Sequence, residues 1–229
     1  MGEAVRNPLP SDADITMGQN LRSLPKFYPI LDAGLLSQHG VGIADFARAI
    51  CDAGVWLVQY RDKTGAPQIV LRNAETVKNA FSGSACLLVM NDRADLAVLA
   101  KWDGVHVGQE DLSPEDARRV VGPERWVGVS THGEDQVRRA DLSCADYVAV
   151  GPVFATGTKL DAEPTIGLTG VRLARALTRK PIVAIGGITR ENARSVIDAG
   201  ADSVAVISAL IVEGEPVEKV VRDFLDVLR

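Results

Sequence analysis

Cysteine, long apolar runs and excess positive charge are all scarce in this sequence, and each shortage excludes a class of protein. The 229 residues include only three cysteines, Cys51, Cys86 and Cys144, which are far apart and lie in or beside apolar stretches. This spacing is typical of buried, reduced thiols, so we expect no disulfide scaffold and a reducing, cytoplasmic environment. No apolar run approaches the roughly 18 residues of a membrane span, and the N-terminus lacks the apolar core of a signal peptide.

The charge balance argues against nucleic acid or an anionic membrane as a partner. The net charge is −5 and the pI about 5.3, whereas both partners require a basic surface. An anionic small molecule would therefore have to be held by a local cluster of cations. The three histidines show neither metal-ligand nor catalytic-triad spacing. The composition leaves a homo-oligomer open.

From Lys26 onward the sequence repeats one unit: a short β-rich run, a polar or glycine-containing turn, and a segment with helical spacing. The predicted strands span residues 27–31, 56–61, 86–90, 104–107, 126–130, 147–151, 182–185 and 203–207. The predicted helices span residues 43–53, 67–81, 93–100, 113–121, 133–140, 167–178, 190–199 and 216–228. Ser113 and Thr189 are the expected N-caps of two of these helices.

Eight strands, each followed by a helix, predict an α/β protein with a single (β/α)8 TIM barrel domain. An open doubly wound sheet, which usually has fewer strands, is the alternative. Residues 1–25 contain prolines and polar residues but few large apolar ones. We expect them to form a flexible N-terminal extension, which leaves residues 26–229 as the barrel.

In such a barrel, functional residues lie at the carboxyl ends of the strands. Gln59, Arg61 and Lys63 alternate at the end of the second predicted strand, so they face the same side. A guanidinium suits two-point contact with a phosphate and an ammonium suits a point charge. A solvated charge cluster is the other interpretation.

The next two predicted strands end in carboxylates. Asp92 follows Asn91 at the end of one strand, and Asp111 follows the other. Neighbouring strands lie about 5 Å apart, so the two carboxylates can share one ion, and oxygen ligands favour Mg²⁺ over zinc. Each aspartate is equally suited to capping the following helix.

The remaining strand ends carry hydroxyl groups, one cation and paired glycines. Glycine pairs let a phosphate approach the backbone closely, and hydroxyl and ammonium groups donate to its oxygens. For Thr156, Thr158 and Lys159, which follow the strand 147–151, a solvated loop is the alternative, and for the glycine pair it is tight packing. The residues concerned are Ser130, Thr156, Thr158, Lys159, Gly186, Gly187, Ile207 and Ser208.

Taken together, five ordered blocks resemble the thiamine-phosphate synthase (thiamine-phosphate pyrophosphorylase) family over residues 26–209. The blocks are Gln59-x-Arg61-x-Lys63, Asn91-Asp92-Arg93, Gly104-Val-His106-x-Gly-Gln109-x-Asp111, Gly151-Pro-x-Phe154-x-Thr156-x-Thr158-Lys159 and Ala184-Ile-Gly-Gly-Ile188. The family fold is a (β/α)8 barrel, as the strand count predicts independently. Ala155 and Gly157 stand where many members carry proline or bulkier residues, and Leu31 precedes Asp32 where threonine is common.

The resemblance implies a transferase that joins 4-amino-2-methyl-5-hydroxymethylpyrimidine diphosphate to 4-methyl-5-(2-hydroxyethyl)thiazole phosphate and releases pyrophosphate. By analogy, Asp92 and Asp111 hold Mg²⁺, and Arg61, Lys63, Ser130 and Lys159 act in catalysis. The pyrimidine diphosphate is bound by Gln59, Arg61, Lys63 and Asn91, with Ser130 and Lys159 at its diphosphate. The thiazole phosphate is bound by Thr156, Thr158, Gly186, Gly187, Ile207 and Ser208.

Three alternatives remain open on the same barrel. A thiazole tautomerase-like relative would need neither diphosphate nor Mg²⁺, and His132 keeps it open. A sugar-phosphate isomerase would use the glycine pair but leave Gln59 unexplained. A non-catalytic barrel would bind thiamine phosphate without making it.

Overall fold

The structure is a computed structural model, and it describes residues 24–156 and 164–229. Eight parallel strands close into a barrel in the order β1 to β8. The strands are β1 (Phe27–Asp32), β2 (Leu57–Arg61), β3 (Leu87–Asn91), β4 (Gly104–Val107), β5 (Trp126–Thr131), β6 (Tyr147–Val150), β7 (Ile182–Ile185) and β8 (Ser203–Val206). The single (β/α)8 barrel predicted from the sequence is confirmed.

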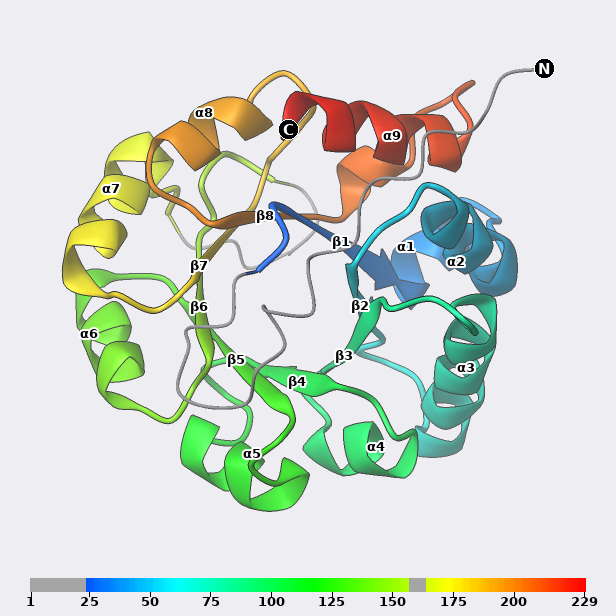
Figure 1. The fold of residues 1–229 in the computed structure, drawn as a ribbon, viewed down its shortest axis with the longest axis horizontal. Helices are drawn as coiled ribbons and strands as arrows, with labels where there is room; N and C mark the ends of the chain where they lie inside the picture. Colours follow the sequence, from blue (N-terminus) through cyan, green and yellow to red (C-terminus); the bar gives the residue numbers. More distant parts are fainter. Residues whose placement is uncertain (1–23, 157–163) are drawn as a thin grey trace.

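The helices form an outer ring around the strands (Figure 1). They are α1 (Ala33–Gln38), α2 (Ile43–Asp52), α3 (Pro67–Ala80), α4 (Ala94–Leu99), α5 (Pro114–Val121), α6 (Glu134–Leu142), α7 (Gly167–Leu177), α8 (Ala193–Asp198) and α9 (Val217–Val227), with a short 3₁₀ helix η2 (Ser208–Leu210) before α9. Within the described ranges every strand is followed by at least one helix, which is the connection that parallel strands require.

The strands are apolar without alternation because both of their faces are covered. Inside the barrel a cluster of ten buried side chains includes Tyr28, Trp126 and Tyr147. Outside, a larger cluster fills the layer between the sheet and the helices. Parallel sheets covered on both faces have this continuous apolar character.

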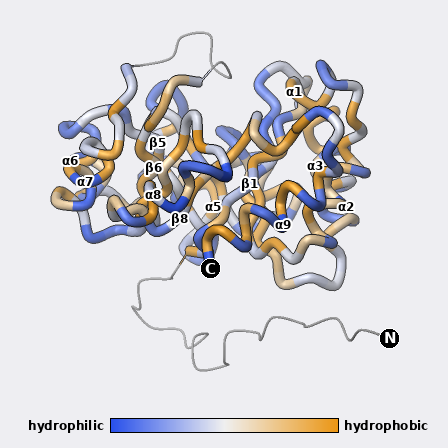
Figure 2. Tube along the Cα trace, turned by 90° about the horizontal axis from the view of Figure 1, so that it is seen from above, coloured by the Kyte–Doolittle hydropathy of each residue, from blue (hydrophilic) through white to orange (hydrophobic). Residues whose placement is uncertain are grey.

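Helix α9 illustrates how the outer layer packs. Hydrophobic and hydrophilic residues alternate along it in Figure 2, and Val220, Val221 and Phe224 are its buried residues. The Phe224 ring stacks on Phe27 of β1, with ring centroids 5.0 Å apart.

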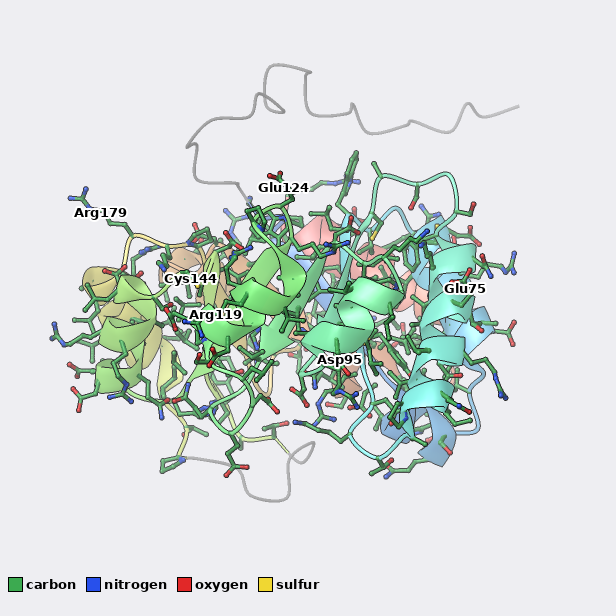
Figure 3. All side chains as sticks on the ribbon, turned by 90° about the horizontal axis from the view of Figure 1, so that it is seen from below. Glu75, Asp95, Arg119, Glu124, Cys144 and Arg179 are labelled. Atoms are coloured by element: carbon green, nitrogen blue, oxygen red, sulfur yellow. The ribbon has the colours of Figure 1, made fainter. Side chains whose placement is uncertain are left out.

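Charged side chains such as Glu75 project from the outer surface of the helices (Figure 3). Among the described residues, no helix has the length and apolar character to cross a membrane.

The chain is anchored near both ends of the described part. Leu24 is buried and belongs to the cluster inside the barrel, so the core begins at least two residues before the predicted boundary at residue 26. Lys26 Nζ donates to the carbonyl oxygen of Arg229, 3.3 Å away. The last residue of the chain therefore lies beside the segment that leads into β1.

Two helices differ from the sequence prediction. Helix α1 was not predicted; it starts where the Asp32 carboxylate accepts from the backbone N–H of Leu35 at 2.9 Å. Helix α8 begins at Ala193, and Thr189 does not cap it; instead the Thr189 N–H donates to Asn192 Oδ1 at 2.8 Å. The predicted cap at Ser113 is confirmed, since its hydroxyl accepts from the Asp116 N–H at 3.1 Å.

Candidate active site

Most predicted site residues that the structure describes lie at or just beyond the carboxyl ends of their strands, on one rim of the barrel. Gln59 is the exception, because it lies in the middle of β2 and is buried. The strand register sets their neighbours: Asp32 is paired with Arg61 across β1 and β2, and Asn91 with His106 across β3 and β4. Thr158 and Lys159 lie outside the described residues, so their predicted roles are not tested by the structure.

Basic and acidic side chains are interleaved at the ends of β1 to β4. Arg61 forms an ion pair with Asp32, whose side chain is almost fully buried. Lys63 Nζ lies 2.5 Å from Asp92 Oδ2. The sequence suggested that Arg61 and Lys63 face one side; the structure adds that each of them already has a carboxylate partner.

Asp92 and Asp111 lie within hydrogen-bonding reach of each other. Burial raises the pKa of the Asp92 carboxyl above its ordinary value; Lys63 counteracts this and Asp111 reinforces it. Asp111 is oriented by the backbone N–H of Gly108, which donates to its Oδ2 at 2.8 Å. The predicted proximity of the two carboxylates is therefore confirmed.

The donor set at this point suits Mg²⁺. Among the described residues there is no group of three or more histidine, cysteine, aspartate or glutamate side chains that could enclose a metal. Mg²⁺ is usually held by one or two carboxylates, with substrate phosphates and water completing its octahedron. The Asp92–Asp111 pair therefore fits Mg²⁺ better than a metal that needs a full protein cage.

A chain of polar side chains crosses the interior of the barrel below this rim. Gln59 Nε2 donates to the Tyr28 hydroxyl at 3.0 Å, and the hydroxyls of Tyr28 and Tyr147 are 3.1 Å apart. The Tyr147 hydroxyl lies 3.0 Å from His106 Nδ1, and His106 Nε2 lies 2.8 Å from Ser130 Oγ. Two predicted substrate ligands, Gln59 and Ser130, are thus connected through three aromatic side chains.

Asn91 presents an unsatisfied donor at the same rim. Its Nδ2 is buried and has no hydrogen-bond partner within the described part of the chain. A buried donor without an acceptor costs about 1–3 kcal/mol, so native structures rarely leave one unpaired unless a water or a ligand satisfies it.

The ends of β6 and β7 are held together by backbone contacts. The N–H groups of Val153 and Phe154 donate to the carbonyls of Ile185 and Gly186, both at 2.9 Å. Gly187 has a φ of 64°, and a Cβ added there would lie 2.5 Å from the carbonyl oxygen of Ala155. Glycine is required here because the β6 loop passes too close for any side chain. The glycine pair therefore lies against the β6 loop from Pro152 to Ala155.

The last predicted residues follow β8. Ile207 comes directly after the strand, and Ser208 begins the short helix η2. The backbone of Ile207 and the hydroxyl group of Ser208 therefore lie at the end of β8, the strand that neighbours β7. His132, in contrast, is turned to the backbone: its Nδ1 lies 2.7 Å from the carbonyl oxygen of Gly151.

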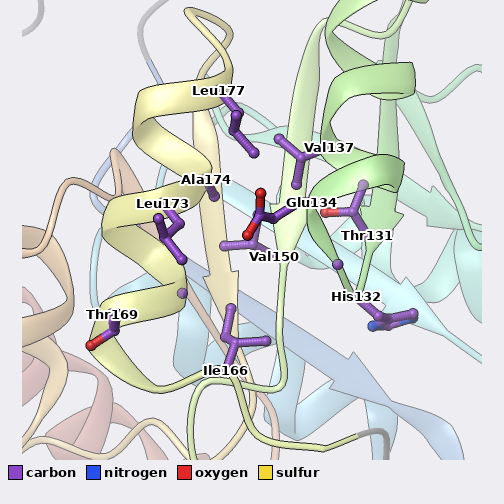
Figure 4. A pocket seen from close by; sticks show the side chains of 12 residues that line it. Thr131, His132, Glu134, Val137, Val150, Ile166, Thr169, Leu173, Ala174 and Leu177 are labelled. Atoms are coloured by element: carbon purple, nitrogen blue, oxygen red, sulfur yellow. The ribbon is translucent and has the colours of Figure 1, made fainter.

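A cavity of about 260 Å³ lies elsewhere, between helices α6 and α7 (Figure 4). Its walls are mainly aliphatic, with Val137, Val150 and Leu173 among the lining residues, and none of the predicted substrate or metal ligands lines it. The polar cluster at the rim, and not this cavity, is therefore the candidate active site.

Sequence reasoning gave no role to four contributors to the site: Asp32, Tyr28, Tyr147 and His106. The tyrosines lie within apolar strands, where nothing in the sequence distinguishes a residue facing the barrel interior from one facing the helices. Asp32 does carry a signal, because it directly follows an apolar strand in the same way as Asp92. Its pairing with Arg61 depends on the β1–β2 register.

A closed barrel whose rim carries interleaved cations and carboxylates is typical of enzymes that act on phosphorylated small molecules. The family model described as thiamine monophosphate synthase matches residues 27–210. The chain belongs to this family. It is accordingly a transferase of thiamine biosynthesis that forms thiamine phosphate.

Individual relatives agree with the family model. A thiamine-phosphate synthase of Koribacter versatilis is 52% identical over 192 residues, which cover 83% of this chain and 90% of that protein. One from Methanosarcina mazei is 39% identical over 94% of this chain and 88% of its own length. The solved thiamine phosphate pyrophosphorylase from Pyrococcus furiosus has a TM-score of 0.80 and 31% identity, covering 91% of this chain and 98% of that one.

Proposed function

We propose that this rim joins 4-amino-2-methyl-5-hydroxymethylpyrimidine diphosphate to 4-methyl-5-(2-hydroxyethyl)thiazole phosphate by Mg²⁺-assisted dissociative substitution. The observation that carries the proposal is the contiguous set Arg61, Lys63, Asp92 and Asp111. Such a set matches a leaving group with several negative charges, because cations and a carboxylate-bound metal both stabilise the charge that develops on it.

Asp92 and Asp111 would hold the metal. Two carboxylates in mutual contact repel each other when both are ionised, and a divalent cation between them removes that repulsion. When bound, Mg²⁺ supplies Lewis-acid stabilisation to the departing pyrophosphate. Lys63, which is paired with Asp92 at 2.5 Å, would be available to a diphosphate oxygen with that carboxylate engaged by the metal.

The pyrimidine diphosphate would lie across the ends of β2 to β5. Gln59 and Asn91 face its ring, and the unpaired Asn91 Nδ2 supplies a donor that a ring nitrogen can satisfy. Arg61 and Lys63 bind the diphosphate, with Ser130 and Lys159 assigned to its oxygens by the family resemblance. Their shared task is to bind the pyrophosphate more tightly as its charge grows.

The bond changes need no general base. The carbon–oxygen bond between the pyrimidine methylene and the diphosphate breaks, and its electron pair leaves with pyrophosphate. The lone pair of the thiazole nitrogen then forms the new carbon–nitrogen bond. This nitrogen carries no proton to remove, so the proposed mechanism uses no Cys–His or Ser–His pair as nucleophile.

The thiazole phosphate would bind at the ends of β6 to β8. Gly186 and Gly187 pack against the β6 loop and are partly exposed, so their backbone would meet the phosphate. Thr156, Thr158 and Ser208 would add hydroxyl donors, with Ile207 at the end of the strand. Placing the two anionic groups at different sides of the rim keeps their charges apart while the reacting atoms meet.

The other sequence interpretations gain no specific support. The His132 ring contacts the Gly151 carbonyl through Nδ1, so a tautomerase-like reaction would have to use its Nε2 as the base, and it would leave the Asp92–Asp111 pair unexplained. A non-catalytic thiamine phosphate-binding barrel has no need of two carboxylates in contact. We place the reaction in the cytosol, because Cys51, Cys86 and Cys144 are all free thiols.

One assay tests the proposal. Purified protein is mixed with both heterocyclic substrates, with and without Mg²⁺, and thiamine phosphate and pyrophosphate are measured together. We expect equal amounts of the two products, formed only when the metal is present. Folded protein that forms neither product would overturn the reaction. Product formation that persists after chelation would overturn only the assignment of Mg²⁺.

A further inference from the structure

The interior polar chain has five members: Gln59, Tyr28, Tyr147, His106 and Ser130. Adjacent members are separated by 2.8 to 3.1 Å. Tyr28 and Tyr147 are each only 1% exposed, so water does not compete for their hydroxyl groups. Burial raises the pKa of both phenols, and each therefore keeps the proton that it can donate.

The chemistry of the first member sets the direction of the hydrogen bonds. Gln59 Nε2 can only donate, so the Tyr28 oxygen accepts and the Tyr28 proton is given to Tyr147. Tyr147 in turn donates to His106 Nδ1, which must then be unprotonated. The proton of the neutral imidazole is consequently on Nε2 and is donated to Ser130 Oγ.

The opposite direction leaves a buried group unsatisfied. If Ser130 donated to His106, the Tyr28 oxygen would accept from both Gln59 and Tyr147. Its own proton would then have no acceptor among the described residues, since Gln59 Nε2 and the Tyr147 hydroxyl are its only hydrogen-bond partners there. An unsatisfied buried donor is costly, so the direction from Gln59 to Ser130 is the stable one.

We propose that Tyr28 and Tyr147 are positioning residues: they fix His106 as its Nε2–H tautomer and thereby turn the Ser130 hydroxyl proton toward the substrate. Ser130 is half-buried at the rim, and its carbonyl is held by Gln109 Nε2 at 2.6 Å. Because its oxygen is occupied as an acceptor, the hydroxyl is available as a donor to an anionic oxygen. The assignment rests on the proposed function only in naming that oxygen as part of the diphosphate.

The tautomer can be measured without any activity. In ligand-free protein, ¹⁵N NMR of the imidazole nitrogens should show His106 with Nδ1 unprotonated and Nε2 protonated. The His106 signals are assigned as those that disappear in a His106→Asn variant. His132 is the internal control, because its Nδ1 must donate to the Gly151 carbonyl and should carry the proton. Finding the Nδ1–H tautomer at His106 would overturn the proposal even if the enzyme makes thiamine phosphate.

Kinetics test whether the chain matters for the substrate. Tyr28→Phe removes the hydroxyl that links Gln59 to Tyr147, and we expect kcat/KM for the pyrimidine diphosphate to fall about tenfold, the size of one lost buried hydrogen bond. KM for the thiazole phosphate should stay within about twofold. Tyr60→Phe is the matched control, since its hydroxyl also bonds two side chains, Asp62 and Asn73, but outside the barrel interior.

A double-mutant cycle identifies the route of the effect. Tyr28 does not hydrogen-bond Ser130 directly, so independent action would make the losses of Tyr28→Phe and Ser130→Ala multiply. If Tyr28 acts through Ser130, the double variant should be scarcely worse than Ser130→Ala alone. Multiplying losses, or a Tyr28→Phe enzyme as active as Tyr60→Phe, would overturn the proposal. Absence of activity in the wild-type protein would overturn the proposed function and leave the NMR result standing.

Discussion

The two halves of the rim present different chemical groups. The ends of β1 to β5 carry ionised and amide side chains, held in pairs such as Arg61–Asp32 and Lys63–Asp92. Among the described residues, the ends of β6 to β8 contribute chiefly backbone around Gly186 and Gly187, which lies close against the β6 loop. Side chains can adjust to a charge that grows during a reaction, whereas backbone offers a fixed cradle. We infer that the first half, together with Lys159, performs the chemistry and that the rest of the second half holds the reacting partner.

The largest effect on the comparison between the two halves of the rim is expected from a substitution at Asp92. We expect Asp92→Asn to lower Mg²⁺-dependent turnover about 100-fold or more, since a metal ligand stabilises the transition state by several kcal/mol. Asparagine is the right replacement because Asp92 has a φ of 62°, and asparagine tolerates the left-handed conformation. Turnover at limiting Mg²⁺ and the melting temperature are the measurements.

Asp95→Ala is the matched control for this variant. Asp95 is exposed and paired with Arg93 at 2.6 Å, on the outward side of the same segment. Its loss should leave turnover unchanged. Equal Mg²⁺ dependence in Asp92→Asn and wild type would refute Asp92 as a ligand.

In the backbone half, the sharpest test is Gly187→Ala. A Cβ there would overlap the Ala155 carbonyl and Phe154, so we expect a loss of about 2–4 kcal/mol in the free energy of unfolding and a raised KM for the thiazole phosphate. Gly40→Ala separates strain from contact, because Gly40 has a nearly equal φ of 65° and an added Cβ would meet nothing within 4 Å. It should cost only about 1 kcal/mol and leave KM unchanged. Similar KM values in the two variants would contradict the proposal that backbone at Gly187 helps to bind the thiazole phosphate.

Asp32→Asn tests whether the ion pair positions Arg61. Asparagine still caps α1 through its side-chain oxygen, but it no longer carries the charge that holds the guanidinium. We expect KM for the pyrimidine diphosphate to rise about tenfold. Asp146→Asn is the control, because Asp146 also pairs with an arginine and accepts from a backbone N–H, away from the rim. An unchanged KM in Asp32→Asn would remove Asp32 from the site.

The smallest effect is expected at the anchor of the β7 loop. Arg190 pairs with Glu215 and Asp223 near α9, and chiefly its hydrogen bond lowers the pKa of Glu215 from 4.5 to about 2. A depressed carboxyl pKa stabilises the fold above pH 4.5, and this contribution is lost as the pH falls toward 2. Arg190→Ala should flatten the dependence of the melting temperature on pH in this window. The difference should be small and shrink with salt; a large, salt-insensitive difference would contradict the assignment.

The strands and the barrel were predictable because a strand buried on both faces is a short, continuous apolar run in the sequence. The eight apolar runs correspond to β1 to β8 with ends that shift by one residue at most. Helix α1 was missed because six residues are too few to show a period. The start of α8 was missed because Thr189 and Asn192 both suit a cap, and only the path of the chain selects between them.

The site was predictable wherever alternation or strand neighbourhood determined it. Alternation predicted that Gln59, Arg61 and Lys63 face one side, which stays a prediction because β2 ends at Arg61; adjacent strands brought Asp92 to Asp111. The sequence could not show that each cation already has a carboxylate partner, because Asp32 meets Arg61 only through the register of β1 and β2. Nor could it reveal the tyrosine chain, since which face of an all-apolar strand points inward is settled only by closure of the barrel.

The contact between Lys26 and the carbonyl of Arg229 brings the last residue of the chain next to the segment before β1. The path of the chain around the barrel therefore nearly closes on itself, as the sheet does. A short peptide from Arg229 back to Leu24 would bridge neighbouring points on the surface, and the order of the strands around the ring would not change. Fresh ends could then be opened at an outer turn, for example at Gly83, which has open space around its Cα. Such a permuted enzyme should retain its rim, because no residue of the rim depends on which strand is made first.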